Sequence, residues 1–333
     1  MIELDKVCKN YGLTKALIDV SFTIEKGEIV GFVGPNGAGK TTAMKIITTY
    51  TAPSSGTAKV GGYDVLENPL QVRELIGYLP ETVPLYSDML VNEYLEFIGQ
   101  ARHLNGKFKQ RFDWVVQAAG LEPVLKRKIG ELSKGFKQRT CLAQALIHDP
   151  DVLILDEPTS GLDPLQIIGI RNLVKELAHE KTIILSTHIL PEVATISDRI
   201  LVINDGLIVA DGSFDDLRKQ VTRRSSVYIA VKSTKKDFDS ALKSVSDLED
   251  VEYDENRKRG EIGAHLFFKS TADPISKIND LIRAQNWHIM EFHPEKLSLE
   301  DSFIRLTQST SSNEKQSTDE AKTKSTSEEG GAE

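Results

Sequence analysis

Residues 34–41 carry the pattern in this chain whose chemistry follows most directly from residue type and spacing. Their sequence, Gly-Pro-Asn-Gly-Ala-Gly-Lys-Thr, fits G-x-x-x-x-G-K-[ST], in which glycines let backbone N–H groups converge on phosphate oxygens. Lys40 would reach the β- and γ-phosphates of a nucleotide, and the Thr41 hydroxyl would ligate Mg²⁺. The residues expected to contact the nucleotide are Gly34, Pro35, Asn36, Gly37, Ala38, Gly39, Lys40, Thr41 and Thr42.

Two adjacent carboxylates follow a second apolar segment of the chain. Residues 151–155, DVLIL, are typical of a buried strand, and Asp156 and Glu157 come directly after it. Strand ends of this kind bind ligands in parallel-sheet folds. Asp156 is expected to hold Mg²⁺, and Glu157 to orient or deprotonate the attacking water. The alternative is a pair of exposed acids at the start of a turn, which the phosphate loop disfavours.

Two further side chains have candidate roles at this site. His188 follows the apolar strand 182–186, and its position favours a γ-phosphate contact over the structural role that a lone histidine usually has. Tyr11 lies on a turn ahead of the phosphate loop. It could stack on a purine base or be an ordinary tyrosine at a strand edge, and its spacing favours neither.

The elements that must position these residues alternate between strand and helix. The phosphate loop follows the apolar strand 28–33 and precedes residues with helical spacing, which disfavours a chance glycine turn. Residues 1–25 predict two strands, 88–150 a mostly helical subdomain, and 200–210 a hairpin around Asn204-Asp205-Gly206. Further strands are predicted at 57–60 and 76–79, with a helix at 69–75 between them. This alternation predicts an α/β fold with a mostly parallel, helix-covered sheet.

The segment 82–90 is unusually apolar for a loop that contains proline. Its side chains either pack inward or form a docking surface for a partner, and the sequence leaves both open. The formal net charge of −8 argues against a nucleic-acid partner, because phosphate binding needs an excess of Lys and Arg. No stretch approaches the ~20 apolar residues of a membrane-spanning helix, and the first residues do not resemble a signal peptide.

Over about residues 2–220 these motifs, in their order, resemble the ATP-binding subunit of an ATP-binding cassette (ABC) transporter. The segment 132–139, LSKGFKQR, is similar to the family's signature peptide LSGGQ-x-QR. The resemblance implies a P-loop cassette that binds ATP with Mg²⁺ and hydrolyses it. It also implies that two copies of the chain enclose two ATP molecules, with each signature helix capping the nucleotide of the other copy.

The resemblance assigns further roles to single residues. Ser133 and Gly135 would provide γ-phosphate contact and close backbone approach in the other copy, and Asp163 would contact the other copy of the chain. His188 would match the family's switch histidine and Tyr11 its adenine-stacking aromatic.

The sequence departs from the family pattern at three positions. Glu81 stands where most members have a glutamine that contacts Mg²⁺ and the water, so it is a candidate metal ligand and catalytic residue whose extra charge affects rate and metal preference. Lys134 and Phe136 replace residues of the signature. Ser133 and Gly135 are retained, so we expect a functional cap.

The overall pattern, including the segment GYLPET around residue 80, is most similar to cassettes of ABC-2 type exporters, which include gliding-associated and multidrug-like bacterial proteins. The membrane permease is a separate chain in that group. The resemblance therefore implies a peripheral subunit at the cytoplasmic face of the inner membrane. Two alternatives remain: a soluble ABC ATPase acting on ribosomes or DNA, and an ATP switch with little turnover. The transported molecule is not encoded in these residues.

A second domain is expected after the ABC ATPase domain, which we place at 1–220. Residues 225–308 show the order βαββαβ, which predicts a ferredoxin-like α+β domain with an accessory or dimer-stabilising role. A last helix would pack through Leu299, Phe303 and Leu306. Residues 309–333 contain no Leu, Ile, Val, Met or aromatic residue and are expected to be a disordered tail.

Overall fold

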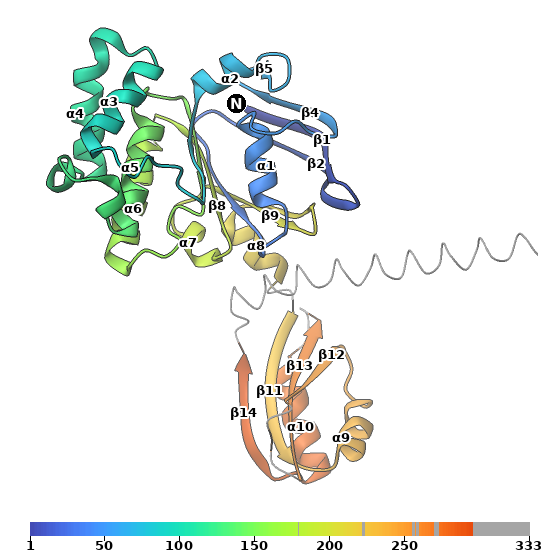
Figure 1. Ribbon diagram of the computed structural model, residues 1–333. Coiled ribbons are helices and arrows are strands. Elements are labelled where there is room, and N and C mark those ends of the chain that lie inside the picture. Colours follow the sequence, from blue (N-terminus) through green and yellow to red (C-terminus); the bar gives the residue numbers. More distant parts are fainter. Residues whose placement is uncertain (179, 222–223, 255–256, 258–259, 270–272, 296–333) are drawn as a thin grey trace, which may run out of the picture. The chain divides into compact units, whose positions relative to one another are not determined.

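The computed structural model describes residues 1–295 except 179, 222–223, 255–256, 258–259 and 270–272. The chain divides into a first unit, Met1–Phe214, and a second unit within Asp215–Arg305 (Figure 1). The expected helix around Phe303 and the expected tail 309–333 lie outside the described residues. Within the described residues, no helix has both the length and the apolar character needed to span a membrane.

A six-stranded sheet forms the centre of the first unit. Its order is β10-β9-β3-β8-β7-β6, and all neighbours pair in parallel except the hairpin of β9 and β10. The strands are β3 (Ile29–Val33), β6 (Ile76–Leu79), β7 (Val152–Asp156), β8 (Thr182–Thr187), β9 (Arg199–Asn204) and β10 (Leu207–Gly212). The predicted α/β fold with a mostly parallel sheet is therefore confirmed.

A second, antiparallel sheet has the order β2-β1-β4-β5. Its strands are β1 (Ile2–Tyr11), β2 (Thr14–Ile24), β4 (Ser55–Val60) and β5 (Tyr63–Asp64). Helix α1 (Lys40–Ile47) lies between this sheet and the six-stranded one. Its buried residues Met44 and Ile47 share one core with Leu4 of β1 and with Phe32 of β3. The helix after the phosphate loop is thus held from two sides.

The other face of the six-stranded sheet is covered by α6 (Pro164–Leu177) and α7 (Leu190–Ala194). Gly31 of β3 shows how closely α7 approaches, because a Cβ atom at this position would lie 2.8 Å from Cβ of Val193. Its neighbours Val30 and Phe32 point to the opposite face, into the core around α1. This alternation is what a strand covered on both faces requires.

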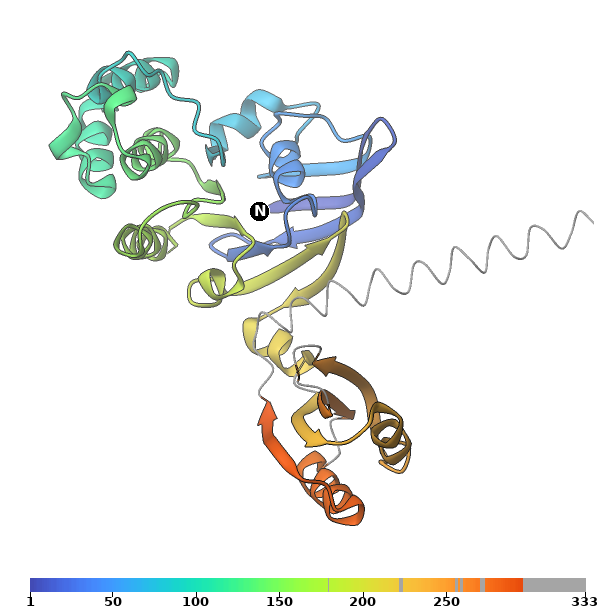
Figure 2. The same ribbon diagram turned by 60° about the horizontal axis from the view of Figure 1, so that its bottom comes forward.

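Three helices form the predicted helical subdomain: α3 (Val91–Ala101), α4 (Phe108–Ala119) and α5 (Lys134–Leu146). Figures 1 and 2 show them together on one side of the first unit, away from the antiparallel sheet. Tyr94 of α3 is buried and its hydroxyl donates a hydrogen bond to Gln144 of α5. The 3-10 turns Asn105–Lys107, Glu122–Val124 and Ile129–Glu131 lie between these helices, and a further helix, α2 (Pro69–Leu75), connects β5 to β6.

The second unit has the predicted βαββαβ order. After α8 (Phe214–Val221), its elements are β11 (Arg224–Lys232), α9 (Lys235–Leu242), β12 (Leu248–Asp254), β13 (Glu261–Lys269), α10 (Pro274–Gln285) and β14 (Ile289–Glu295). The sheet is antiparallel with the order β12-β13-β11-β14. Phe238 of α9 and Ile278 of α10 share a core with Ile229 and Leu266 of the sheet. The ferredoxin-like arrangement is confirmed.

Candidate active site

The parallel strands bring four separate sequence motifs to one edge of the sheet. In the order β3-β8-β7-β6, the phosphate loop follows β3, His188 follows β8, and Glu81 lies two residues beyond β6. Asp156, the last residue of β7, pairs with Ser186 of β8. Because parallel strands end at the same edge, residues up to 154 positions apart in sequence lie in a row.

The phosphate loop has its shape because its glycines permit very close backbone contacts. Gly39 has φ +111°, and a Cβ atom there would lie 2.6 Å from the carbonyl oxygen of Ala16 on β2. A Cβ atom on Gly34 would lie 2.4 Å from the carbonyl oxygen of Ile203 on β9. Any other residue at either position would displace the loop from the strands that support it.

The turn between β9 and β10 braces the loop, a role that the sequence did not suggest. The backbone N–H of Gly206 donates to the carbonyl oxygen of Ala38 at 3.0 Å, and Ile18 N–H donates to the Gly206 carbonyl oxygen at 2.9 Å. The predicted turn at 204–206 therefore connects the phosphate loop to β2. Its only sequence signal was the strong turn composition Asn-Asp-Gly.

Lys40 and Glu157 lie close to one another at the centre of the site. Lys40 Nζ is 3.6 Å from Glu157 Oε1, and both side chains are more than nine-tenths buried. The ammonium group also donates to the carbonyl oxygens of Gly34 at 2.7 Å and Pro35 at 3.2 Å. His188 Nδ1 lies 3.0 Å from both carboxylate oxygens of Glu157, and 45% of the histidine side chain is exposed. The Glu157 carboxylate thus contacts two groups, the ammonium of Lys40 and the imidazole of His188.

Asp156 is fully buried, and only one of its two carboxylate oxygens has a partner. Ser186 Oγ donates to Oδ1 at 2.5 Å, whereas Oδ2 has no hydrogen-bond partner among the described residues. Ser186 was not identified from the sequence, because a serine inside an apolar strand gives no functional signal by itself.

Glu192 of α7 is a second residue of the site without a functional signal in the sequence. It is buried, and its Oε2 atom accepts hydrogen bonds from Thr159 Oγ1 at 2.7 Å and from Thr187 Oγ1 at 3.1 Å. Thr159 lies two residues after Glu157, and Thr187 lies directly before His188. Glu192 therefore joins the two segments that carry the acids and the histidine.

An open cleft of about 340 Å³ lies over the phosphate loop; we call it the loop cleft. It is lined by Ala16, Asn36, Gly37, Gly39, Lys40, Thr41, Thr42, Glu81 and Glu157. Backbone N–H groups, a lysine and the start of α1 together favour phosphate groups in this cleft. The structure thus brings Glu81 and Glu157 to the same cleft as the loop residues.

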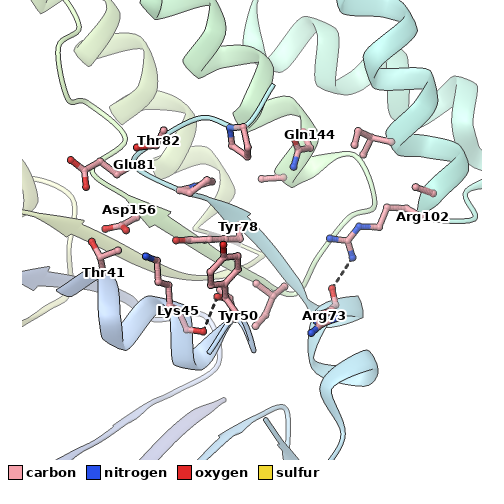
Figure 3. A pocket seen from close by; sticks show the side chains of 17 residues that line it. Thr41, Lys45, Tyr50, Arg73, Tyr78, Glu81, Thr82, Arg102, Gln144 and Asp156 are labelled. Atoms are coloured by element: carbon pink, nitrogen blue, oxygen red, sulfur yellow. Dashed lines mark hydrogen bonds between the residues drawn. The ribbon is translucent and has the colours of Figure 1, made fainter. Parts of the chain in front are cut away.

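A second hollow of about 620 Å³, the side groove, lies next to the loop cleft between β6, α1 and the helical subdomain (Figure 3). Thr41 and Glu81 line both. In Figure 3, Thr41, Glu81 and Asp156 lie at one end of the groove, and Arg73 and Arg102 at the other. Arg102 Nη1 donates to the carbonyl oxygen of Arg73 at 2.8 Å.

Between the two ends of the side groove lie Tyr50 and Tyr78. Burial, with the nearby charge of Asp156, raises the pKa of Tyr78 well above its usual value, so this phenol stays protonated. The apolar segment 82–90 borders the groove through Thr82 and Pro84. Its Tyr86 is 56% exposed and packs edge-on against Tyr94 and Phe97 of α3, so the segment packs on the helical subdomain but leaves aromatic surface exposed.

Tyr11 lies at the end of the β1–β2 hairpin, where it pairs with Thr14. Its ring is 50% exposed, and Lys9 Nζ lies 5.1 Å from the ring centroid. Tyr11 does not line the loop cleft, although Ala16 of the same hairpin does.

Ser133, Gly135 and Asp163 lie together but not at the loop cleft. Ser133 caps α5 by accepting from Phe136 N–H at 3.4 Å, and Asp163 caps α6 by accepting from Gln166 N–H at 2.9 Å. A Cβ atom on Gly135 would lie 2.3 Å from Gln166 Oε1, so the two helix starts are in contact. Within one copy of the chain, this surface is separate from the residues that line the loop cleft.

The residues present fit a magnesium ion whose remaining ligands are phosphate oxygens and water. Asp156 offers a buried oxygen without a partner, and Thr41 and Glu81 line the same groove. Among the described residues, no group of three or more His, Cys, Asp or Glu side chains could hold a metal ion. An ion here would therefore rely on one or two carboxylates, which is the usual arrangement for magnesium at nucleotide sites.

The chain is similar in sequence and in fold to known ATP-binding proteins of transporters. A sequence profile described as ABC transporter matches residues 17–160. The ABC transporter ATP-binding protein NatA of Bacillus subtilis (strain 168) is 38% identical over 221 residues, which are 65% of this chain and 89% of NatA. The bacitracin transport ATP-binding protein BcrA of Bacillus licheniformis is 31% identical over 308 residues, which are 92% of this chain and 97% of BcrA.

A solved structure shows the same fold for the first unit. It is a dimeric ATP-binding cassette in a post-hydrolysis state with ADP and phosphate bound. The TM-score is 0.58 at 26% identity, and the match covers 64% of this chain and 98% of the other.

Proposed function

The chain belongs to the family of ABC transporter ATP-binding proteins and is an ATPase, and from this premise we propose that it drives export through a separate membrane permease. The observation that carries the proposal is the meeting of Lys40 and Glu157 in the loop cleft, with His188 in contact with Glu157, beside a groove that is open for a partner. BcrA, whose name states bacitracin transport, matches over nearly its whole length. This match supports a role in transport.

Hydrolysis follows from the arrangement in the loop cleft. Lys40 and the backbone N–H groups of residues 36–41 bind the β- and γ-phosphates, and these phosphates compete with the Glu157 carboxylate for the ammonium group of Lys40. Glu157 orients a water molecule and accepts its proton as the water oxygen bonds to the γ-phosphorus. The bond from that phosphorus to the β–γ bridging oxygen breaks, giving ADP and phosphate. His188 contacts the γ-phosphate, and its hydrogen bond to Glu157 positions the carboxylate.

Thr41, Asp156 and Glu81 are the residues that we assign to Mg²⁺. When bound, the ion would neutralise phosphate charge during the reaction. Ser186 keeps Asp156 in place through its hydrogen bond to Oδ1, which leaves Oδ2 available.

A second copy of the chain completes the site in this proposal. Ser133, Gly135 and Asp163 form a surface that does not reach the loop cleft of their own copy. In a dimer they would face the nucleotide of the other copy, as their resemblance to family motifs implies. Tyr11 would stack on the adenine, and its half-exposed ring beside the β1–β2 turn leaves room for this.

The side groove is the proposed docking site of an ABC-2 type permease. It joins the helical subdomain to the loop cleft, since Thr41 and Glu81 line both hollows. A cytoplasmic segment of the permease in this groove would thus touch a residue that also borders the nucleotide. The exposed aromatic ring of Tyr86 beside the groove extends the surface. The subunit would then be peripheral, at the cytoplasmic face of the membrane.

Co-purification from native membranes, with an ATPase assay on the eluted material, tests the proposal. We expect a stoichiometric membrane protein that stimulates hydrolysis, and no hydrolysis when Lys40→Ala is purified in the same way. Arg102→Glu should lower recovery of the membrane protein because it reverses a charge in the side groove, with ATP binding as the check that the variant is folded. Lys109→Glu makes the same charge change on α4, outside the groove, and should not lower recovery.

Two results would contradict the proposal. Recovery with ribosomes or DNA instead of a membrane protein would assign the ATPase to a soluble process. ATP binding without hydrolysis by the wild-type complex would assign it to a switch with little turnover.

A further inference from the structure

The residues around Asp156 do not fully compensate the charge of its buried carboxylate. It is fully buried, and its Oδ2 atom has no hydrogen-bond partner among the described residues. A buried carboxylate with an unpartnered oxygen is costly unless a cation or a donor compensates it. The oxygen belongs to a residue that lines the side groove, where Thr41 and Glu81 lie at the same end.

The nearby lysines do not provide this compensation in the structure. Lys40 is engaged by Glu157 and by two carbonyl oxygens of the phosphate loop. Lys45 Nζ lies 5.7 Å from the centroid of the Tyr50 ring. Among the described residues, Asp156 makes no ion pair within 4 Å.

Glu81 provides a second carboxylate at the end of the side groove where Asp156 lies. It is exposed and borders both the side groove and the loop cleft, so its side chain can turn toward Asp156 without a change in the fold. Glu81 stands where most members of the family have a glutamine. An amide oxygen is a neutral ligand, whereas a carboxylate oxygen brings a full negative charge to a divalent ion.

We propose that Glu81 and Asp156, with the hydroxyl of Thr41, form a two-carboxylate site that binds a divalent cation before any nucleotide is present. This deepens the magnesium assignment of the proposed function and rests on it for the identity of Asp156 and Thr41 as ligands. The cation would stay with the protein when nucleotide leaves. A site with a single carboxylate needs phosphate oxygens to retain an ion. Glu81 supplies the second carboxylate that makes this site different.

The test measures binding of Mn²⁺ to the full chain without added nucleotide, with free Mn²⁺ counted by electron paramagnetic resonance. We expect about one tightly held ion per chain in the wild type. Glu81→Gln keeps the shape of the side chain and removes its charge, and should weaken Mn²⁺ binding by about tenfold or more. Asp156→Asn should remove the bound ion.

Asp88→Asn is the matched control. Asp88 is an exposed acid in the same segment as Glu81 and lines neither hollow, so its loss should leave Mn²⁺ binding unchanged. Melting curves of all variants check the fold, and Glu81→Gln keeps the test decisive if Asp156→Asn is unstable, because Glu81 is exposed.

Equal Mn²⁺ binding by wild type and Glu81→Gln would overturn the inference, as would absence of binding to the wild type without nucleotide. In both cases ATP hydrolysis by the wild type would leave the proposed function intact. If instead Mn²⁺ binds as expected but neither ATP binding nor hydrolysis is found, the cation site stands and the proposed function fails.

Discussion

At the scale of single residues, the site depends on buried polar groups that do not touch the nucleotide in our proposal. Glu192 is the clearest case. Its carboxylate accepts hydrogen bonds from Thr159 and Thr187, and these threonines belong to the segments that carry Glu157 and His188. A carboxylate that joins two segments fixes their separation more firmly than apolar contact alone.

Replacing Glu192 by Ala should destabilise the protein and slow ATP hydrolysis. Two buried hydroxyl donors would lose their acceptor, at a cost of about 1–3 kcal/mol each in the free energy of unfolding. Glu192→Gln keeps an acceptor oxygen and should be milder in both respects. Urea denaturation and the ATPase rate measure the two effects.

Glu176→Gln is the control, because Glu176 is an exposed acid on α6. A Glu192→Ala protein with wild-type unfolding and wild-type turnover would show that these hydrogen bonds do not position the site.

At the scale of elements, His148 connects the helical subdomain to the six-stranded sheet. It follows α5, and its Nε2 atom lies 3.0 Å from the carbonyl oxygen of Ile76 at the start of β6. Its Nδ1 atom is buried and has no hydrogen-bond partner among the described residues. Burial, and next the charge of Arg102, lowers the pKa of His148 from 6.5 to about 4.

This lowered pKa predicts a pH-dependent loss of stability. Between pH 6.5 and about 4 the unfolded chain binds a proton at His148 that the folded chain does not, so stability falls as the pH falls. The contribution is fully present above pH 6.5. Its loss toward pH 4 amounts to at most about 3 kcal/mol, from a shift of about 2.5 pH units.

Urea unfolding at a series of pH values checks this prediction. His148→Gln, which does not titrate, should show a flatter dependence of the free energy of unfolding on pH in this window. His103→Gln removes an exposed histidine and should keep the wild-type slope. Parallel curves for wild type and His148→Gln would contradict the assignment.

At the scale of the whole molecule, the separation of two surfaces favours assembly. The loop cleft holds Lys40 and Glu157, whereas Ser133 and Asp163 cap helices on a surface that does not reach it. Each surface is one half of the site in our proposal. ATP would then join two copies, and hydrolysis would let them separate.

Glu157→Gln should hold the dimer closed in the presence of ATP. The amide can still accept hydrogen bonds, but it cannot take the proton of the attacking water, so turnover should fall by about a hundredfold or more. Light scattering after size-exclusion chromatography should show an ATP-dependent dimer that persists. Turnover close to that of the wild type would refute the base assignment, and Glu176→Gln serves again as the unaffected control.

The sequence by itself determined the features that depend on neighbouring residues. The phosphate loop is eight contiguous residues, and its chemistry follows from their types and spacing. The βαββαβ order of the second unit and the apolar strands of the first follow from local periodicity, and the structure has them. Asp156 and Glu157 at the end of β7 could also be identified, because they directly follow an apolar run of residues.

Only the tertiary structure decided which distant segments meet. The order β3-β8-β7-β6 places Glu81, Asp156 and His188 in one row, and no local pattern encodes this order. Ser186 and Glu192 became visible only through their buried partners, since a serine in a strand and a glutamate on a short helix look ordinary in sequence. Strand pairing and burial are long-range properties, so they arise from packing of the whole unit and not from the periodicity of any one segment.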